Sequence, residues 1–120
     1  MALDVRTTIF PFRVSLKDQK SEWDFRLDFT NKEQNPSKVL LEVSLPSEAT
    51  FTKASYSQKY ETKFEMVKPG QTVSLKLPIF VSKHGEIGEF FGNLKLTEHF
   101  GDYGYVTKTY NRELLLKIVP

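Results

Sequence analysis

Residues able to bind a metal ion or to exchange protons gather near the end of the chain, between Lys83 and Gly104. This stretch holds both histidines and five of the six glycines. Imidazole and carboxylate groups suit zinc or manganese, and a pair of carboxylates in a cleft can act as acid and base. If the stretch folds as a hairpin, its two histidines could approach each other. The side chains of these types are His84, Glu86, Glu89, Glu98, His99 and Asp102.

The spacing of these residues does not match a known metal or catalytic motif. No H-x-H or H-E-x-x-H sequence places two ligands on one face of an element, and no serine lies in G-x-S-x-G. The chain has no cysteine, so thiolate metal sites, thiol nucleophiles and disulfides are excluded. We therefore interpret these residues as solvated polar side chains beside turns, and we predict a protein that is not an enzyme and needs no cofactor. Whether His84 and His99 bind a metal stays open.

The glycines of the same stretch do not form a phosphate-binding loop. A dinucleotide loop has the spacing G-x-G-x-x-G and opens a helix, whereas Gly85, Gly88 and Gly92 lie three and four residues apart. The residues that follow, Leu94 to Thr97, have the pattern of a strand. We expect Gly85 and Gly88 to let the backbone turn tightly as it enters that strand. Gly92 would lie on its inward side, where a missing side chain makes room for a neighbour.

Apolar and polar residues alternate along most of the chain, which predicts strands that each bury one face in an antiparallel sheet. The five runs begin at Trp23, Val39, Val73, Leu94 and Leu114. We expect one dry interior that contains Phe25, Leu41, Leu75, Leu94 and Leu116.

An earlier run, from Thr8 to Leu16, places Phe10, Phe12, Val14 and Leu16 on one parity. Pro11 lies within it, so the run is predicted to be a single edge strand with those four side chains on one face.

Turn residues separate the strands. Pro69-Gly70 fits the two central positions of a type II turn, in which the second residue takes a positive φ. The segment from Asn31 to Ser37 links two strands and is rich in turn formers. Short strands with such breaks, about seven to nine of them, predict an all-β protein with a single immunoglobulin-like antiparallel β-sandwich over residues 1–120.

Composition excludes several classes of partner. The 17 basic and 15 acidic residues are interspersed and give a net charge of +2, so we expect no nucleic-acid partner. No apolar run approaches the ~20 residues of a spanning helix, so we expect no direct membrane span. The absence of cysteine fits a reducing compartment, and we expect a cytoplasmic location. The alternative is a domain cut from a membrane-anchored protein.

Four segments carry a family resemblance: DFRLDFTN, KVLLEVSLP, VKPGQTVSLKLPIFVSKHGEIGEFFGNLKLTEHFGDYG and LLLKIVP. Together they resemble the immunoglobulin-like segment that precedes a von Willebrand factor A-like domain of unknown function in a family of prokaryotic membrane proteins. The resemblance implies a non-catalytic scaffolding role. The family's membrane role and metal site are not carried over. The matching positions are Asn31, Pro69-Gly70, His84-Gly85 with Gly88 or Gly92, Phe100-Gly101 and Val119-Pro120.

A sandwich has edge strands with unpaired N–H and C=O groups, so our first hypothesis is a protein-interaction or assembly module. A partner's strand or a second copy of the chain would pair with an edge. Pro11 has no N–H to donate and so weakens pairing along the Thr7–Leu16 edge. The opposite edge or the final strand is therefore the better candidate for binding a partner. A spacer whose edges are all protected remains an alternative.

A second hypothesis is a carbohydrate-binding or small-ligand-binding sandwich. It uses tyrosines in loops or edges as stacking platforms, although such tyrosines also pack over the open ends of a sandwich. The candidate contact residues are Tyr56, Tyr60, Tyr103 and Tyr105.

Overall fold

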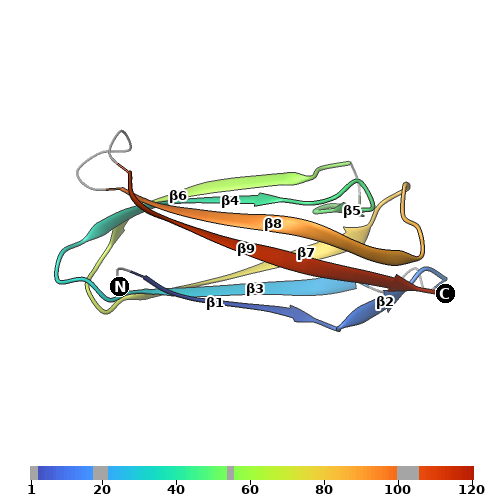
Figure 1. Cartoon of the computed structure of the whole chain (residues 1–120), viewed down its shortest axis with the longest axis horizontal. Coiled ribbons are helices and arrows are strands. Elements are labelled where there is room, and N and C mark those ends of the chain that lie inside the picture. Colours follow the sequence, from blue (N-terminus) through green and yellow to red (C-terminus); the bar gives the residue numbers. More distant parts are fainter. Residues whose placement is uncertain (1–2, 18–21, 54–55, 100–105) are drawn as a thin grey trace.

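Nine β-strands in two sheets form the described part of the protein (Figure 1). The computed structural model describes residues 3–17, 22–53, 56–99 and 106–120. The strands are β1 (Leu3–Phe10), β2 (Arg13–Ser15), β3 (Glu22–Asn31), β4 (Ser37–Ser44), β5 (Ala49–Thr50), β6 (Lys59–Val67), β7 (Thr72–Val81), β8 (Gly88–His99) and β9 (Val106–Val119).

The two sheets face each other in an elongated sandwich that measures 49 × 23 × 21 Å. One sheet has the strand order β1-β3-β7-β5, and the other has the order β2-β9-β8-β4-β6. Neighbouring strands are antiparallel except β2, which runs parallel to β9. The predicted all-β immunoglobulin-like sandwich is therefore confirmed.

The core lies between the sheets and is built by the predicted alternation. On β3, for example, Trp23 and Phe25 are fully buried, whereas Asp24 between them is exposed. Phe25, Leu41, Leu94 and Leu116 meet in this interior as expected. Leu75 is only half-buried, because β7 has no neighbouring strand on one side over most of its length. Trp23 is a core residue, and none of the described atoms accepts a hydrogen bond from its indole nitrogen.

The predicted type II turn joins β6 to β7. The backbone N of Gln71 donates to the carbonyl of Lys68 at 2.9 Å, and Gly70 has a φ of 78°. That positive φ is the value which position three of this turn requires, and glycine adopts it without strain. Asn31 at the end of β3 is tied to the turn, because its carbonyl accepts from the N–H of Gly70 at 2.8 Å.

The prediction for the first run was wrong, because Thr8 to Leu16 does not form one strand. The chain leaves the first sheet after Phe10, passes a cis Phe10–Pro11 peptide, and enters the second sheet as β2. Each strand then has its own inward parity. β1 turns its odd-numbered residues inward, so Phe10 is 70% exposed, and β2 buries Val14 and leaves Phe12 64% exposed.

The glycines at β8 have the structural roles expected of them. Gly88 begins the strand with a φ of 151°, a conformation that other residues rarely adopt. Gly92 is buried on the inward side. A Cβ atom added there would lie 2.9 Å from the carbonyl oxygen of Ser44 and 3.6 Å from the Cβ of Leu114. The missing side chain therefore lets β4 and β9 pack closely against β8.

Candidate functional site: the open edge of β9

Strand β9 has a neighbour on one side only for most of its length. β8 pairs with it from Val106 to Ile118, whereas β2 covers only Lys117 to Val119 on the other side. Among the strands that the structure describes, none pairs with Val106–Leu116 on the side away from β8. We call this stretch the β9 edge. Its free backbone groups can accept a further strand.

The backbone groups that face this open side can be assigned. The carbonyl of Val119 points toward β2, because it accepts from the N–H of Leu16 at 2.7 Å. Backbone groups of alternate residues point the same way, and the pairing with β8 is regular from Ile118 back to Lys108. The residues whose N–H and C=O groups face the open side are therefore Thr109, Asn111, Glu113 and Leu115.

The edges of β7 and β6 carry features that disfavour pairing with another strand. β7 is also open, from Thr72 to Ile79, but its even-numbered residues face the open side, because the N–H of Ser82 donates toward β5, to the carbonyl of Glu48, at 2.9 Å. Pro78 falls in that row and has no N–H to donate. The β6 edge presents a row of exposed charges, Lys59, Glu61, Lys63 and Glu65, which disfavours pairing with another strand.

A hollow lies beside the β9 edge, between the two sheets. Figure 1 shows β9 and β1 along the same side of the sandwich, one in each sheet. The hollow has a volume of about 210 Å³, and its lining includes Thr7, Ile9, Phe12, Leu114 and Leu115. A strand added to β9 would direct alternate side chains into this space.

The hydroxyl of Tyr110 bridges the two sheets near one end of this side. Leu3 of β1 donates its backbone N–H to the Tyr110 hydroxyl at 3.0 Å, and both residues are buried. At the other end β2 occupies the edge. β2 thus closes one end of the open side, and the Tyr110–Leu3 contact joins the two sheets within it.

Arg112 is a charged residue on the inward side of the β9 edge. Its neighbours on that side, Tyr110 and Leu114, are buried, but Arg112 is exposed because no further strand covers it. Its Nη1 donates to the carbonyl of Asn111 at 2.9 Å. That carbonyl is one of the acceptors facing the open side, so the guanidinium caps the edge. No carboxylate of the described residues lies within ion-pair distance of it.

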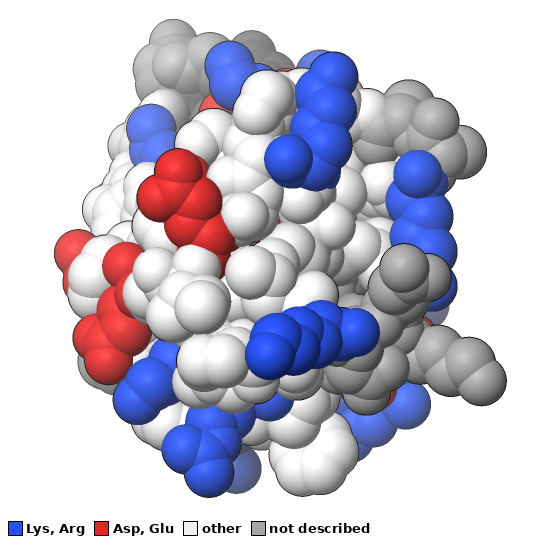
Figure 2. All heavy atoms as spheres, turned by 90° about the vertical axis from the view of Figure 1, so that its right-hand side faces the viewer, with Lys and Arg blue, Asp and Glu red and all other residues white. Residues whose placement is uncertain are grey.

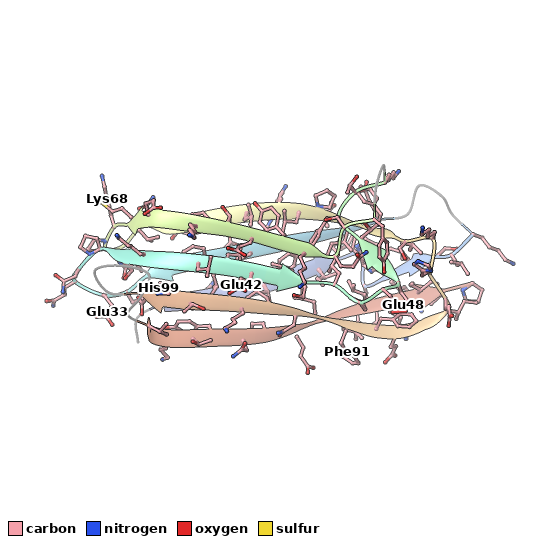
Figure 3. All side chains as sticks on the ribbon, turned by 90° about the horizontal axis from the view of Figure 1, so that it is seen from above. Glu33, Glu42, Glu48, Lys68, Phe91 and His99 are labelled. Atoms are coloured by element: carbon pink, nitrogen blue, oxygen red, sulfur yellow. The ribbon has the colours of Figure 1, made fainter. Side chains whose placement is uncertain are left out.

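An apolar patch borders the edge on the outer face of its sheet. Phe91 is 57% exposed and lies directly opposite Leu115. Phe12 and Leu115 both line the hollow. Figure 3 shows Phe91 pointing away from the sandwich. Lys117 joins these groups, because its Nζ is 3.6 Å from Oε1 of Glu89 and 5.7 Å from the centre of the Phe12 ring.

The two histidines do not approach each other. His84 precedes β8 and His99 ends it, so a strand of 12 residues separates them, roughly 36 Å at the usual rise. In Figure 3, His99 lies at the opposite end of the sandwich from Glu48, whose carbonyl contacts the segment of His84. The described residues include no group of three metal-binding side chains. Asp102 lies outside those residues.

The two tyrosines of the predicted contact set that can be described, Tyr56 and Tyr60, pack against different residues. Tyr56 is 45% exposed, its hydroxyl donates to the carbonyl of Ser47 at 3.1 Å, and its ring meets His84 edge-on with centres 5.2 Å apart. Tyr60 is half-buried and packs on Phe51 with ring centres 6.0 Å apart. Tyr103 and Tyr105 lie outside the described residues. Carbohydrate binding stays a prediction.

Basic side chains do not gather on the face that Figure 2 presents, and the acidic side chains lie mainly on its left side. Lys and Arg side chains lie around this end of the sandwich with uncharged surface between them. The described residues contain no helix with the length and apolarity that crossing a membrane requires.

Comparison with known proteins gives a fold and no family. No protein-family model matches the chain, and no curated protein matches it significantly. Among solved structures, the chain is similar to AggA, the major subunit of aggregative adherence fimbriae type I from Escherichia coli. The TM-score is 0.59 at 13% identity, over 99% of this chain and 97% of AggA. The resemblance to the von Willebrand factor A-associated segment therefore stays a prediction.

Sequence reasoning missed two components of the candidate site. Arg112 interrupts the inward row of β9 between Tyr110 and Leu114, and that interruption was the available signal. Phe12 was assigned to the same face as Val14, since the change of sheet after Phe10 cannot be read from the spacing of apolar residues.

Proposed function

We propose that this chain is a non-catalytic assembly module that binds an extended strand of a protein partner along the β9 edge. The observation that carries this proposal is the row of N–H and C=O groups at Thr109, Asn111, Glu113 and Leu115 that faces no other strand in the described structure. Pairing with this row would satisfy main-chain hydrogen bonds and extend the sheet by one strand.

The hollow beside the edge supports this mode of binding. Side chains of the added strand that point inward would enter the space between Ile9 and Leu114, where they would bury apolar surface. Side chains that point outward would lie beside Leu115 and the exposed ring of Phe12. AggA, which shares the fold, is a subunit of a fimbrial assembly, and a structural role in an assembly fits the proposal.

The test removes one open-side N–H without touching the pairing with β8. Asn111 is exposed and its N–H faces the open side, so Asn111→Pro removes a donor needed by an added strand and none used by β8. Asn111→Thr is the matched control, since it keeps the N–H. The probe is a soluble peptide of about nine residues that alternates Val and Thr, long enough for one strand.

Hydrogen exchange with the full chain measures the result. We expect the peptide to slow exchange at Thr109, Glu113 and Leu115 in the wild type and in Asn111→Thr, and to have no effect on Asn111→Pro. Light scattering over a range of concentrations distinguishes a bound peptide from a second copy of the chain. Unchanged exchange at these amides, with peptide and at every protein concentration, contradicts the proposal. Equal peptide binding by Asn111→Pro does so as well.

A further inference from the structure

We infer that Arg112 makes the β9 edge selective for a partner strand that carries an acidic residue on its inward side. This inference rests on the proposed function, and it specifies the chemistry of the strand.

The first step concerns the group that an incoming strand meets at the Asn111 carbonyl. In the protein without a partner, the guanidinium of Arg112 donates a hydrogen bond to the carbonyl of Asn111 at 2.9 Å. That carbonyl faces the open side, so an added strand needs it as an acceptor for one of its own N–H groups. The N–H of an added strand therefore competes with the guanidinium for this carbonyl, or shares its oxygen with it.

The second step concerns where the guanidinium then lies. Arg112 is on the inward side, between the buried residues Tyr110 and Leu114, so an added strand would cover it. A covered charge without a partner is costly, whereas a carboxylate can pair with guanidinium through two parallel hydrogen bonds. An apolar or basic residue opposite Arg112 would leave the charge unpaired. A charge that points inward at an open edge is also a known protection against indiscriminate pairing.

Lys108 is the other cation on the same side of β9, and its position differs. Its Nζ lies 5.1 Å from the centre of the Tyr110 ring, which provides a cation–π contact within the chain. The hollow that receives inward side chains is lined by Leu114, two residues beyond Arg112. The fitting strand therefore places its acidic residue opposite Arg112 and, two positions away, an apolar residue opposite Leu114.

A second copy of this chain does not supply such a strand when the inward face of its described edge continues the inward face of β9. The inward residues of β1 and β6 are uncharged, as are those of β7, and those of β9 include two cations. These inward residues are Leu3, Val5, Thr7 and Ile9 of β1, Tyr60, Thr62 and Phe64 of β6, Val73, Leu75 and Leu77 of β7, and Lys108, Tyr110, Arg112 and Leu114 of β9. We therefore assign the occupant to a strand of another protein.

The experiment compares three peptides of the Val–Thr design that differ at one central inward position, which is Asp, Val or Lys. Binding to the full chain is measured by fluorescence anisotropy, and the location of binding is measured by exchange of the open-side amides. We expect the Asp peptide to bind at least about tenfold more tightly than the Lys peptide, with the Val peptide between them.

Substitutions assign the preference to one residue. Arg112→Glu should reverse the order of the Asp and Lys peptides, and Arg112→Gln should make the affinities alike. Lys108→Gln is the matched control and should keep the wild-type order. Arg112 is exposed, so these variants are expected to be as stable as the wild type and to unfold at the same urea concentration.

Three outcomes overturn the inference. Equal affinity of the three peptides, with protection of the open-side amides, removes the acid requirement but leaves the proposed function standing. Loss of the preference in Lys108→Gln instead of Arg112→Gln shows that the wrong cation was assigned. A dimer of the wild-type chain paired through β9 contradicts the assignment of the occupant to another protein. Absence of protection by any peptide contradicts the proposed function itself.

Discussion

The side-chain amide of Asn31, at the end of β3 in one sheet, donates to the carbonyl of Val67, at the end of β6 in the other sheet, at 2.8 Å. The same nitrogen donates to the carbonyl of Asn35 at 2.9 Å, and Oδ1 accepts from the N–H of Glu33 at 2.8 Å. Asn31 is fully buried. One side chain thus joins the two sheets and the β3–β4 connection, with its amide donors and acceptor in use.

Asn31→Ala should lower the free energy of unfolding by about 2–3 kcal/mol, because it leaves buried carbonyl and N–H groups without partners. Urea denaturation measures the change. Asn35→Ala is the control, since that residue is exposed and contributes its backbone carbonyl, so it should stay within about 0.5 kcal/mol of the wild type. Equal effects of the two substitutions would show that the buried amide does not join the sheets.

Two glycines should respond differently to alanine. At Gly92 the added methyl group would lie 2.9 Å from the carbonyl oxygen of Ser44, so β8 and β4 must move apart. This movement should lower the free energy of unfolding by about 2 kcal/mol. A Cβ atom added at Gly70 would have no neighbouring atom within 4 Å, so only the φ of 78° disfavours a side chain there. The free energy of unfolding should therefore fall by about 1 kcal/mol. Thermal unfolding of both variants measures this order. A larger loss of stability in Gly70→Ala than in Gly92→Ala would contradict the close packing described for Gly92.

Tyr110→Phe should lower the free energy of unfolding by about 1–2 kcal/mol, because the buried N–H of Leu3 loses its acceptor. It should also speed hydrogen exchange at Leu3, where β1 is held to β9. The control is Tyr60→Phe, which removes a hydroxyl that makes no hydrogen bond to the described residues. If exchange at Leu3 is unchanged in Tyr110→Phe, the hydroxyl does not hold the two strands together.

The change of sheet after Phe10 predicts opposite outcomes for neighbouring apolar residues. Phe10→Ala should change the free energy of unfolding by less than about 0.5 kcal/mol, because that ring is 70% exposed. Val14→Ala should cost about 2 kcal/mol, because Val14 is buried in the core. Chemical denaturation of the two variants separates these cases. A large loss of stability in Phe10→Ala would instead support the single edge strand that the apolar spacing predicted.

Hydrogen exchange along β9 should alternate in the protein without a partner. Thr109, Asn111, Glu113 and Leu115 turn their N–H groups to the open side and should exchange fast, whereas amides paired with β8, such as that of Leu114, should exchange slowly. NMR-detected exchange resolves the individual residues. Uniform protection along the strand would mean that another segment already covers the β9 edge.

The alternation of side chains determined most of the fold. Phe25, Leu41, Leu94 and Leu116 lie in the core as predicted, because a strand that buries one face must repeat every two residues. Pro69-Gly70 forms its turn because proline and glycine fix the backbone locally, whatever the rest of the chain does. These features depend on residues close together in the sequence, and the sequence alone is sufficient to predict them.

The tertiary structure decided which edge is open and which residues meet there. The spacing of apolar residues placed Phe10 and Phe12 on one face with Val14, and only the passage of the chain from one sheet to the other left them exposed while Val14 is buried. Arg112 becomes the cap of an open edge because β2 pairs with β9 only at its end, while β1 pairs with β3. Strand order depends on contacts between residues distant in the sequence, and a period of two carries no information about them.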